Sequence, residues 1–458
     1  MSHETALRQA HAAVKRDDWT QAWLATNSIL NEDPDRPEAL FLMGSTLRQM
    51  GNIGLALTCL SKALSREQKH PNLWMAYAAT LHDLNRWDEA IEAFSIVHNM
   101  LPQDAMPIAN ISAGYVQQGK WRDAINKADE ALKLDPENYI AKIAKTFGCL
   151  ALGRWKDGWE NAGYLYGRHL VTRVYRGSGA HEEPEWDGTP GQTVVVQCDQ
   201  GLGDQIMFAQ CVSQLKRDCK EVILECSERM VSLFRRSFPG VTVYGTLKTD
   251  QLEWTGHHAI DAHVHISFLG KWYRNLDSDF PRRPYLVPSP ARKEAWLKWL
   301  AAFPKPWVGI AWKGGIQATS KHLRSCELAD FEPVINRGGT VFDLSYHDSK
   351  SEVSRWNLDN VNQIVVPPID TADYEDTVAL ADCLDDVVCV TTTILHVRGA
   401  LGKHCKVLVP SVPQWREAHK CDDGTSMIWY PQDSVKFYRQ KPGEVDFEFA
   451  IKRLVNES

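Results

Sequence analysis

The chain has 458 residues and a formal net charge of −7, so about three domains of ordinary size are expected. Hydrophobic residues make up 44% and charged residues 24% of it, which excludes a disordered or collagen-like chain. No apolar run is long enough for a membrane span, and the polar start of the chain does not resemble a secretory signal. The eleven cysteines occur singly, which predicts reduced thiols and a cytoplasmic location.

The first third of the chain repeats with a period of 34 residues. A small residue recurs with this step, at Ala22, Ala56, Ala90, Ala124 and Gly158. An aromatic or aliphatic residue stands three positions before it each time, at Trp19, Ile53, Trp87, Trp121 and Trp155. The pattern resembles the tetratricopeptide repeat (TPR), in which stacked helical hairpins bury a continuous core. About five repeats over residues 1–165 therefore predict an all-α solenoid with core tryptophans and a groove for a protein or peptide partner.

Residues 166–192 gain glycine and proline, which indicates a linker. Short apolar runs rich in β-branched residues follow, and helical stretches separate most of them, at residues 193–198, 221–226, 307–312, 339–344, 362–367, 386–390 and 405–410. This alternation predicts parallel sheets covered on both faces. The runs form two blocks, 193–290 and 291–458. Ligands of such sheets bind beyond the carboxyl ends of the strands, so a site in a cleft between the blocks is expected.

The first candidate motif is C-D-Q-G-L-G-D, directly after the strand at 193–198. Gly201 and Gly203 allow a tight turn and close approach of a ligand. Asp204 lies where the next helix begins, and the helix dipole favours its ionised form. The carboxylate is either a general base for an acceptor hydroxyl or a simple helix cap.

The second motif follows the strand at 386–390, where Thr391, Thr392 and Thr393 precede a helix. Hydroxyls and free N–H groups at a helix start suit a phosphate. His396, one turn further on, is either a ligand to a diphosphate oxygen or a helix-packing histidine.

The third motif is a glycine-rich loop after the strand at 307–312 that carries Lys313, Lys321 and Arg324. A cationic loop in this place fits the stabilisation of a leaving diphosphate, where negative charge develops. The alternative is a loop whose charges are only solvated.

These motifs, with D-T-V-A-L-A-D at 376–382 and the closing W-Y-P-Q-D-S-V-K-F-Y-R-Q, resemble the bacterial TPR glycosyltransferase-like proteins. Those proteins are relatives of the ADP-heptose:lipopolysaccharide heptosyltransferases and, more distantly, of the O-linked N-acetylglucosamine transferases. The resemblance covers nearly the whole chain. It implies a GT-B arrangement, with two Rossmann-like domains facing each other across a cleft. The first would hold the acceptor and the second the nucleotide-sugar donor.

The resemblance also implies roles for single residues. Asp204 falls on the proposed base, and Arg324, Ser325, His396 and Arg439 fall on donor-binding motifs. The chain departs from the family where Thr391-Thr392 replaces a usual Asp-Thr pair. The stretch W-K-G-G at 312–315 also replaces a more usual small-Gly-Asn-Pro stretch.

The sequence therefore predicts an enzyme that transfers a sugar from a nucleotide-sugar to an acceptor hydroxyl on a protein, a glycan or a nucleic acid. The resemblance favours inversion. No D-x-D pair follows a strand of the first block, so we expect no metal and no other cofactor. A non-catalytic TPR scaffold with a degenerate transferase domain and a transferase acting on a modified nucleic-acid base are the alternatives. A zinc site at the histidines of 257–265 is a further, less favoured alternative.

Overall fold

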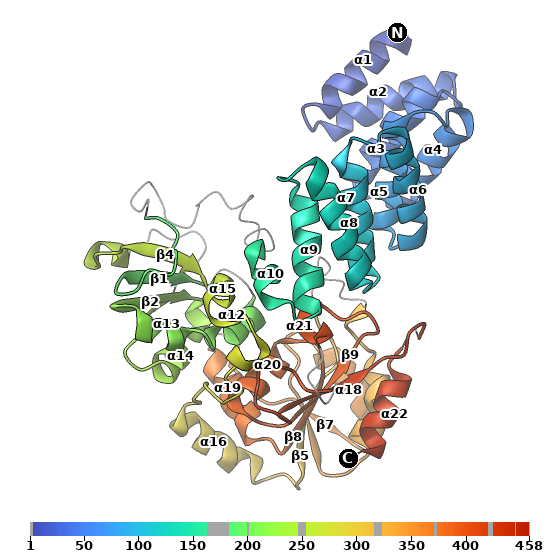
Figure 1. Cartoon of the computed structure of the whole chain (residues 1–458). Coiled ribbons are helices and arrows are strands. Elements are labelled where there is room, and N and C mark those ends of the chain that lie inside the picture. The colour runs from blue at the N-terminus through green and yellow to red at the C-terminus, as the bar shows by residue number, and fades with distance from the viewer. Residues whose placement is uncertain are drawn as a thin grey trace. The chain divides into compact units, whose positions relative to one another are not determined.

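The computed structural model describes residues 3–162, 183–198, 201–245, 253–315, 323–370, 373–419, 425–444 and 446–457. The chain divides into two compact units, Met1–Cys149 and Leu150–Ser458, which are both drawn in Figure 1. Apolar clusters fill the interior of each unit.

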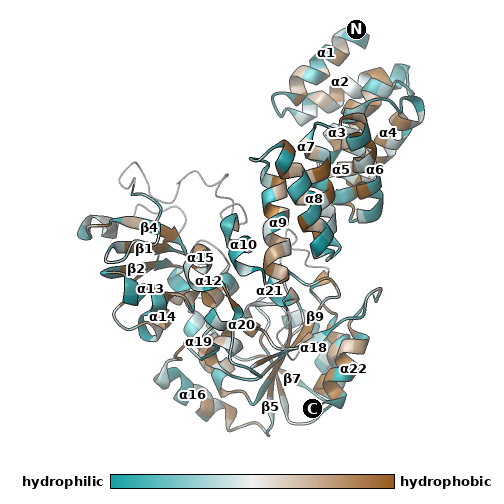
Figure 2. Cartoon of the chain, viewed as in Figure 1, coloured by the Kyte–Doolittle hydropathy of each residue, from teal (hydrophilic) through white to brown (hydrophobic). Residues whose placement is uncertain are grey.

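The first unit is a solenoid of helical hairpins, as the 34-residue period predicts. Its helices are α1 (His3–Val14), α2 (Trp19–Glu32), α3 (Pro37–Gln49), α4 (Ile53–Arg66), α5 (Pro71–Asp83), α6 (Trp87–Met100), α7 (Ala105–Gln117), α8 (Trp121–Leu134) and α9 (Tyr139–Ala151), whose last residues lie past the boundary. Brown and teal patches alternate along these helices in Figure 2, because each helix has one apolar face and one polar face.

The second helix of every repeat begins at the aromatic or aliphatic residue of the 34-residue grid. The small residue three positions later is fully buried, at Ala22, Ala56, Ala90 and Ala124. The residue two positions before each of these helices has a positive φ, at Asp17, Gly51, Asn85, Gly119 and Gly153. Glycine, asparagine and aspartate tolerate this conformation best. The turn therefore restricts the residue at this position, just as close packing restricts the small residue of the grid.

The tryptophans of the grid are less buried than expected. Trp19, Trp87 and Trp121 are half-buried, so the prediction of core tryptophans is wrong for them. Only Trp155 is buried. It begins α10 (Trp155–Glu160), which belongs to the second unit.

The second unit contains two parallel sheets, which confirms the expected α/β architecture. The first sheet has the order β3-β2-β1-β4. Its strands and helices are β1 (Thr193–Gln197), α12 (Leu202–Ala209), α13 (Val212–Asp218), β2 (Glu221–Cys226), α14 (Val231–Ser237), β3 (Thr242–Gly245), β4 (Ala262–His265) and α15 (Gly270–Tyr273). Glu185 adds a short parallel bridge to His263, so part of the expected linker lies against this sheet.

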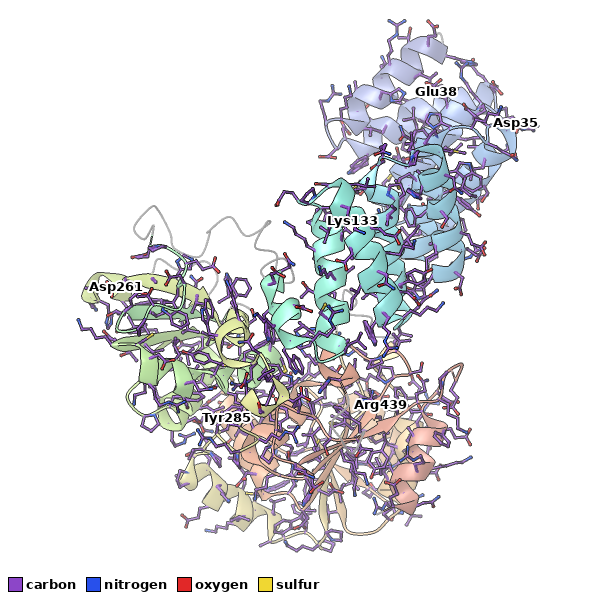
Figure 3. All side chains as sticks on the ribbon, in the orientation of Figure 1. Asp35, Glu38, Lys133, Asp261, Tyr285 and Arg439 are labelled. Atoms are coloured by element: carbon purple, nitrogen blue, oxygen red, sulfur yellow. The ribbon has the colours of Figure 1, made fainter. Side chains whose placement is uncertain are left out.

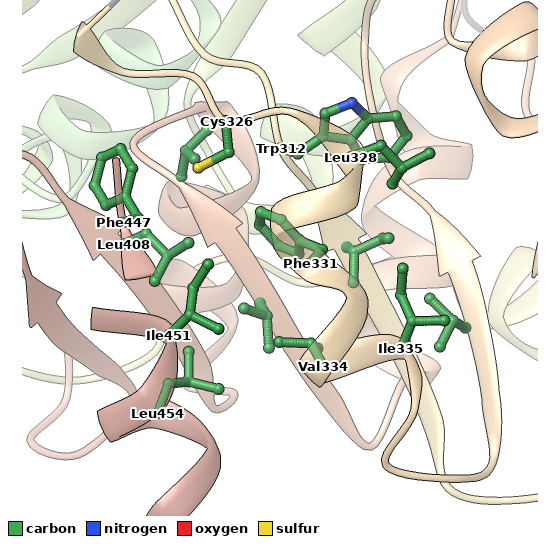
Figure 4. Packing of buried hydrophobic residues seen from close by; sticks show 14 of the residues in the cluster. Trp312, Cys326, Leu328, Phe331, Val334, Ile335, Leu408, Phe447, Ile451 and Leu454 are labelled. Atoms are coloured by element: carbon green, nitrogen blue, oxygen red, sulfur yellow. The ribbon is translucent and has the colours of Figure 1, made fainter. Parts of the chain in front are cut away.

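The second sheet has the order β10-β9-β8-β5-β6-β7. Its strands and helices are α16 (Pro290–Leu300), β5 (Trp307–Ala311), α17 (Glu332–Ile335), β6 (Thr340–Asp343), α18 (Lys350–Asp359), β7 (Ile364–Val365), α19 (Tyr374–Cys383), β8 (Asp386–Val390), α20 (Thr393–Leu401), β9 (Cys405–Val409), α21 (Trp415–Ala418), β10 (Val435–Arg439) and α22 (Glu448–Asn456). Figure 4 shows the apolar cluster on one face of this sheet, which includes Leu408 of β9, Phe331 of the segment before α17, and Ile451 and Leu454 of α22.

Strand order reverses once in each sheet. The first sheet grows from β1 to β3 on one side and then places β4 on the other side of β1. The second grows from β5 to β7 and then returns to add β8 beside β5. In open α/β sheets, ligands bind at the carboxyl ends of the strands where this reversal leaves a crevice. The loops after β1, β5 and β8 therefore lie where a ligand is expected, and these loops carry the three sequence motifs.

Candidate active site at two strand-order reversals

Asp204 lies in the first turn of α12, directly after the loop that leaves β1. Gly201 is the N-cap residue of this helix, and Asp204 makes no cap hydrogen bond there. The carboxylate pairs instead with the guanidinium of Arg416, on α21 after β9. Its side chain remains 23% exposed. Asp204 follows a strand of the first sheet, and Arg416 follows a strand of the second sheet. The ion pair therefore joins the layers of the two sheets.

The starts of α12 and α20 are packed tightly together. A Cβ atom at Gly203 would lie 2.9 Å from the Cδ2 atom of His396, so this position needs glycine for a close helix approach. Tyr285 joins the same two helices, since its hydroxyl donates to the Ile206 carbonyl at 2.7 Å and its N–H donates to the Ala400 carbonyl at 2.9 Å. The two strand-order reversals thus meet through α12 and α20.

Arg324 is bound to the end of β8. Its Nε donates to the Thr391 hydroxyl at 2.9 Å and one terminal nitrogen donates to the Thr391 carbonyl at 2.6 Å. Burial lowers the pKa of Arg324, whereas the negative charges of Glu417 and Asp204 act in the opposite direction. The guanidinium stays charged, because its ordinary pKa lies far above neutrality.

Glu417 is a buried carboxylate among arginines. It is 2% exposed, and no residue that the structure describes gives its Oε2 atom a hydrogen bond. Burial raises the pKa of Glu417, while the positive charges of Arg324, Arg416 and Arg439 lower it. Arg439, labelled in Figure 3, ends β10 and donates to the Glu417 carbonyl at 2.5 Å. A cluster thus lies at the carboxyl ends of β1, β8, β9 and β10. It contains the guanidiniums of Arg324, Arg416 and Arg439 and the carboxyl groups of Asp204 and Glu417.

His396 lies in the same region but is held by the protein. Its Nδ1 atom is 2.7 Å from the Tyr430 hydroxyl, and both side chains are buried. Burial lowers the pKa of His396 to about 3, and the positive charges of Arg416 and Arg324 add to the shift. The imidazole is therefore neutral at any ordinary pH. The same helix carries Arg398, which is buried elsewhere and donates to the carbonyls of Ala381, Leu384 and His404.

Other candidate residues from the sequence lie outside this cluster or only border it. Lys313 pairs with Glu352 of α18 at 3.2 Å, and the described contacts do not join it to Asp204. The Ser325 hydroxyl accepts from the Gly314 N–H at 3.1 Å, so it closes the loop after β5. Thr392 is the N-cap residue of α20 without a side-chain cap bond, and Thr393 begins the helix half-buried. Lys321 lies outside the described residues.

Sequence reasoning missed Arg416 and Glu417. Both stand in the segment Q-W-R-E after β9, where a charged pair follows an apolar parallel strand. The rule that picked out the loops after β1, β5 and β8 applies to β9 as well. It would have singled out this segment.

The histidines of 257–265 form no evident metal site. His258 contacts the Tyr244 hydroxyl at 3.0 Å and the Glu221 carboxylate at 3.2 Å. Within the described ranges there is no group of three or more histidine, cysteine, aspartate or glutamate residues arranged to hold a metal ion. The structure describes ten cysteines, of which nine are buried.

Replacing His396 by glutamine is expected to remove part of the acid sensitivity of folding. The unfolded chain takes up a proton near pH 6.5, whereas the folded chain takes it up only near the pKa of about 3, so acid favours unfolding between these values. The wild type should lose ~2 kcal/mol more unfolding free energy than the variant between pH 7 and pH 5. Urea unfolding at both pH values measures this. An equal loss in the two proteins would contradict it.

The folds of the two units show which class of protein this is. It is a TPR protein whose repeats precede an α/β unit with two parallel sheets. A family model described as "Tetratricopeptide repeat" matches residues 114–145. Another, described as "Anaphase-promoting complex, cyclosome, subunit 3", matches residues 15–96. No helix in the described part of the chain has the length and apolar character needed to cross a membrane.

Among individual proteins, the chain is 25% identical over 421 residues to Protein FlbA of Caulobacter vibrioides. The match covers 87% of this chain and 69% of the relative, so it extends well beyond the repeats. Among solved structures, the chain matches MamA from Desulfovibrio magneticus RS-1 (19% identity, TM-score 0.32) and a thermophilic TPR protein of Thermus thermophilus (18% identity, TM-score 0.32). These matches cover 37% and 38% of this chain, and they take in 95% and 94% of the matched chains.

Proposed function

We propose that the α/β unit is a glycosyltransferase of the GT-B type, which moves a sugar from a nucleotide-sugar donor to an acceptor hydroxyl. The observation that carries this proposal is the cluster of Asp204 with Arg324, Arg416 and Arg439 where the strand order of both sheets reverses. Guanidiniums bind phosphate oxygens bidentately, and a carboxylate beside them accepts a proton.

The reaction balances with the residues of this chain alone. The acceptor oxygen forms a bond to the anomeric carbon of the sugar, and the bond from that carbon to the diphosphate breaks. The electron pair leaves with the nucleoside diphosphate, whose developing charge the guanidiniums of Arg324 and Arg439 stabilise. The hydroxyl proton passes to Asp204. Attack on the face opposite the leaving group gives inversion, and no metal or other cofactor enters the scheme.

We propose that Thr391, Thr392 and Thr393 also contact the donor, because the free N–H groups of the α20 start lie beside Arg324. His396 orients this helix start through Gly203 and Tyr430 rather than exchanging protons, since its imidazole stays neutral. Lys313, in its pair with Glu352, belongs to the rim of the donor site.

We further propose that the repeats bind a segment of a protein partner and bring the acceptor to the transferase unit. Stacked TPR hairpins form an extended surface suited to this use. Cysteines that occur singly in the sequence fit a cytoplasmic enzyme. The acceptor is a protein, a glycan or a nucleic acid.

Calorimetry with a panel of nucleoside diphosphates tests the donor site. The proposal expects micromolar to millimolar binding of one nucleotide in preference to the others. Binding of none would favour the alternative of a non-catalytic TPR scaffold. Mass spectrometry of total protein, glycan and DNA from cells with and without the chain then identifies the acceptor, because only the true acceptor class gains the mass of a sugar.

A further inference from the structure

The ion pair between Asp204 and Arg416 poses a chemical problem for the proposed function, on which this inference rests. The Asp204 oxygen that accepts from the Arg416 guanidinium is not available to an acceptor hydroxyl. The pair therefore has to open before Asp204 can take the proton of an acceptor hydroxyl. Both side chains are partly accessible, at 23% for Asp204 and 14% for Arg416, so a ligand can reach them.

The guanidinium of Arg416 contacts neighbours in its own segment as well as Asp204. The guanidinium lies over the Trp415 ring, 4.9 Å from the centroid, and one terminal nitrogen donates to Gln414 at 3.3 Å. Both partners lie beside Arg416 in sequence, so neither bond depends on Asp204. The neighbouring Glu417 is buried, and its Oε2 atom has no hydrogen bond among the described residues.

The charge balance of the cluster favours an anion. Three guanidiniums face the two carboxylates of Asp204 and Glu417. Glu417 is buried and cannot leave, whereas Asp204 is exposed enough to be hydrated alone. An entering diphosphate thus competes with Asp204 and not with Glu417 for the guanidinium of Arg416. Phosphate oxygens match the fork of a guanidinium as well as a carboxylate does.

We propose that Arg416 binds the diphosphate of the donor and exchanges partners to do so. In the empty site it holds Asp204, and in the loaded site it holds the diphosphate. Asp204 is then uncovered only when the donor is present, so the base becomes available together with the leaving group. The ion pair also prevents Asp204 from acting on a hydroxyl while no sugar is bound.

A double-mutant cycle on the full chain tests the exchange, with inorganic pyrophosphate as the probe in calorimetry. Arg416→Gln should weaken binding by ~10–100 fold, the usual loss of charge-assisted hydrogen bonds. Asp204→Asn should tighten binding by ~3–10 fold, because Arg416 no longer has to leave a charged partner. Asp204→Asn in the Arg416→Gln background should change nothing.

The double variant, Asp204→Asn with Arg416→Gln, distinguishes an exchange of partners by Arg416 from simple repulsion between Asp204 and the phosphates. If Asp204 only repelled the phosphates through space, its removal would tighten binding equally in both backgrounds, and that result would overturn the exchange. Unchanged or weaker pyrophosphate binding by Asp204→Asn alone would overturn it too, as would wild-type affinity in Arg416→Gln. Arg416→Lys, which keeps the charge, guards against a folding defect: it should bind between wild type and Arg416→Gln. Glu294→Gln, an exposed carboxylate on α16, is the matched control and should bind like wild type.

Failure of the exchange and failure of the proposed function give different results. If the cycle behaves as expected but no nucleotide-sugar is consumed, the exchange stands and the transfer proposal falls. If a nucleotide-sugar is consumed while the cycle is additive, the transfer proposal stands and the exchange falls. A wild-type protein that does not bind pyrophosphate at all overturns the exchange directly.

Discussion

Asp204→Asn is expected to lower the rate of glycosyl transfer by ~10²–10⁴ fold, the usual contribution of a positioned general base. Asparagine has nearly the same shape as aspartate, so α12 and its close contact with α20 should be kept. The amide cannot accept the hydroxyl proton, so the transition state loses its base. The donor contacts made by Arg324 and Arg439 remain, and binding of the nucleoside diphosphate should not weaken.

The rate is measured as release of nucleoside diphosphate from the donor that calorimetry selects, at saturating donor and acceptor. Glu294→Gln serves as the matched loss of one carboxylate in the same unit, and it should retain full activity. A fall in activity that saturating donor restores would mean that Asp204 acts in binding. Activity within a few fold of wild type would show that another group takes the proton.

The repeat architecture is predictable from the sequence because each constraint acts locally. The small residue at the helix crossing and the residue at the turn recur at fixed positions in every hairpin. The turn is harder to recognise in two repeats, because Asp17 and Asn85 stand where the other repeats have glycine. All five residues adopt a positive φ. The exposure of Trp19, Trp87 and Trp121 was not predictable, because it depends on how neighbouring hairpins stack.

The strands of the α/β unit were predictable where they form short apolar runs. The predicted apolar runs coincide with β1, β2, β5, β6, β7, β8 and β9. The edge strand β10, V-K-F-Y-R, mixes charged residues with buried apolar ones. The edge strand β4 alternates polar and apolar residues, with H-V-H in a four-residue strand. Alternation is itself a strand signal, and it marked the stretch of His263 and His265 as a probable strand, whereas β10 was not predicted.

The site was predictable only in part, because its residues come from five separate segments. Motifs near a strand end located Asp204, Arg324 and Thr391. The ion pair of Asp204 with Arg416 joins residues 212 positions apart, and no local pattern signals it. The pairing of Lys313 with Glu352 is equally non-local, and it explains why a lysine in a glycine-rich loop is not free to enter the cluster.

Trp155→Ala is expected to lower the unfolding free energy of the second unit by ~3–5 kcal/mol, as is typical for removing a fully buried tryptophan. Trp155 stands on the repeat grid, yet it is 2% exposed and packs within the α/β unit. Its indole N–H donates to Asp277 at 2.6 Å, and its ring centroid lies 4.9 Å from that of Phe280 and 5.0 Å from that of His419. The fifth repeat therefore ends as part of the α/β unit.

Trp121 provides the matched control, because it occupies the same grid position one repeat earlier and is only half-buried. Trp121→Ala should cost ~1–2 kcal/mol, since less apolar area is lost. Hydrogen exchange of the full chain followed by mass spectrometry distinguishes the two. Trp155→Ala should reduce protection in residues 266–280 and 415–419, whereas Trp121→Ala should affect only the repeats. Because His419 follows α21, loss of Trp155 should also weaken pyrophosphate binding through Arg416, and unchanged affinity would show that α21 does not depend on α10.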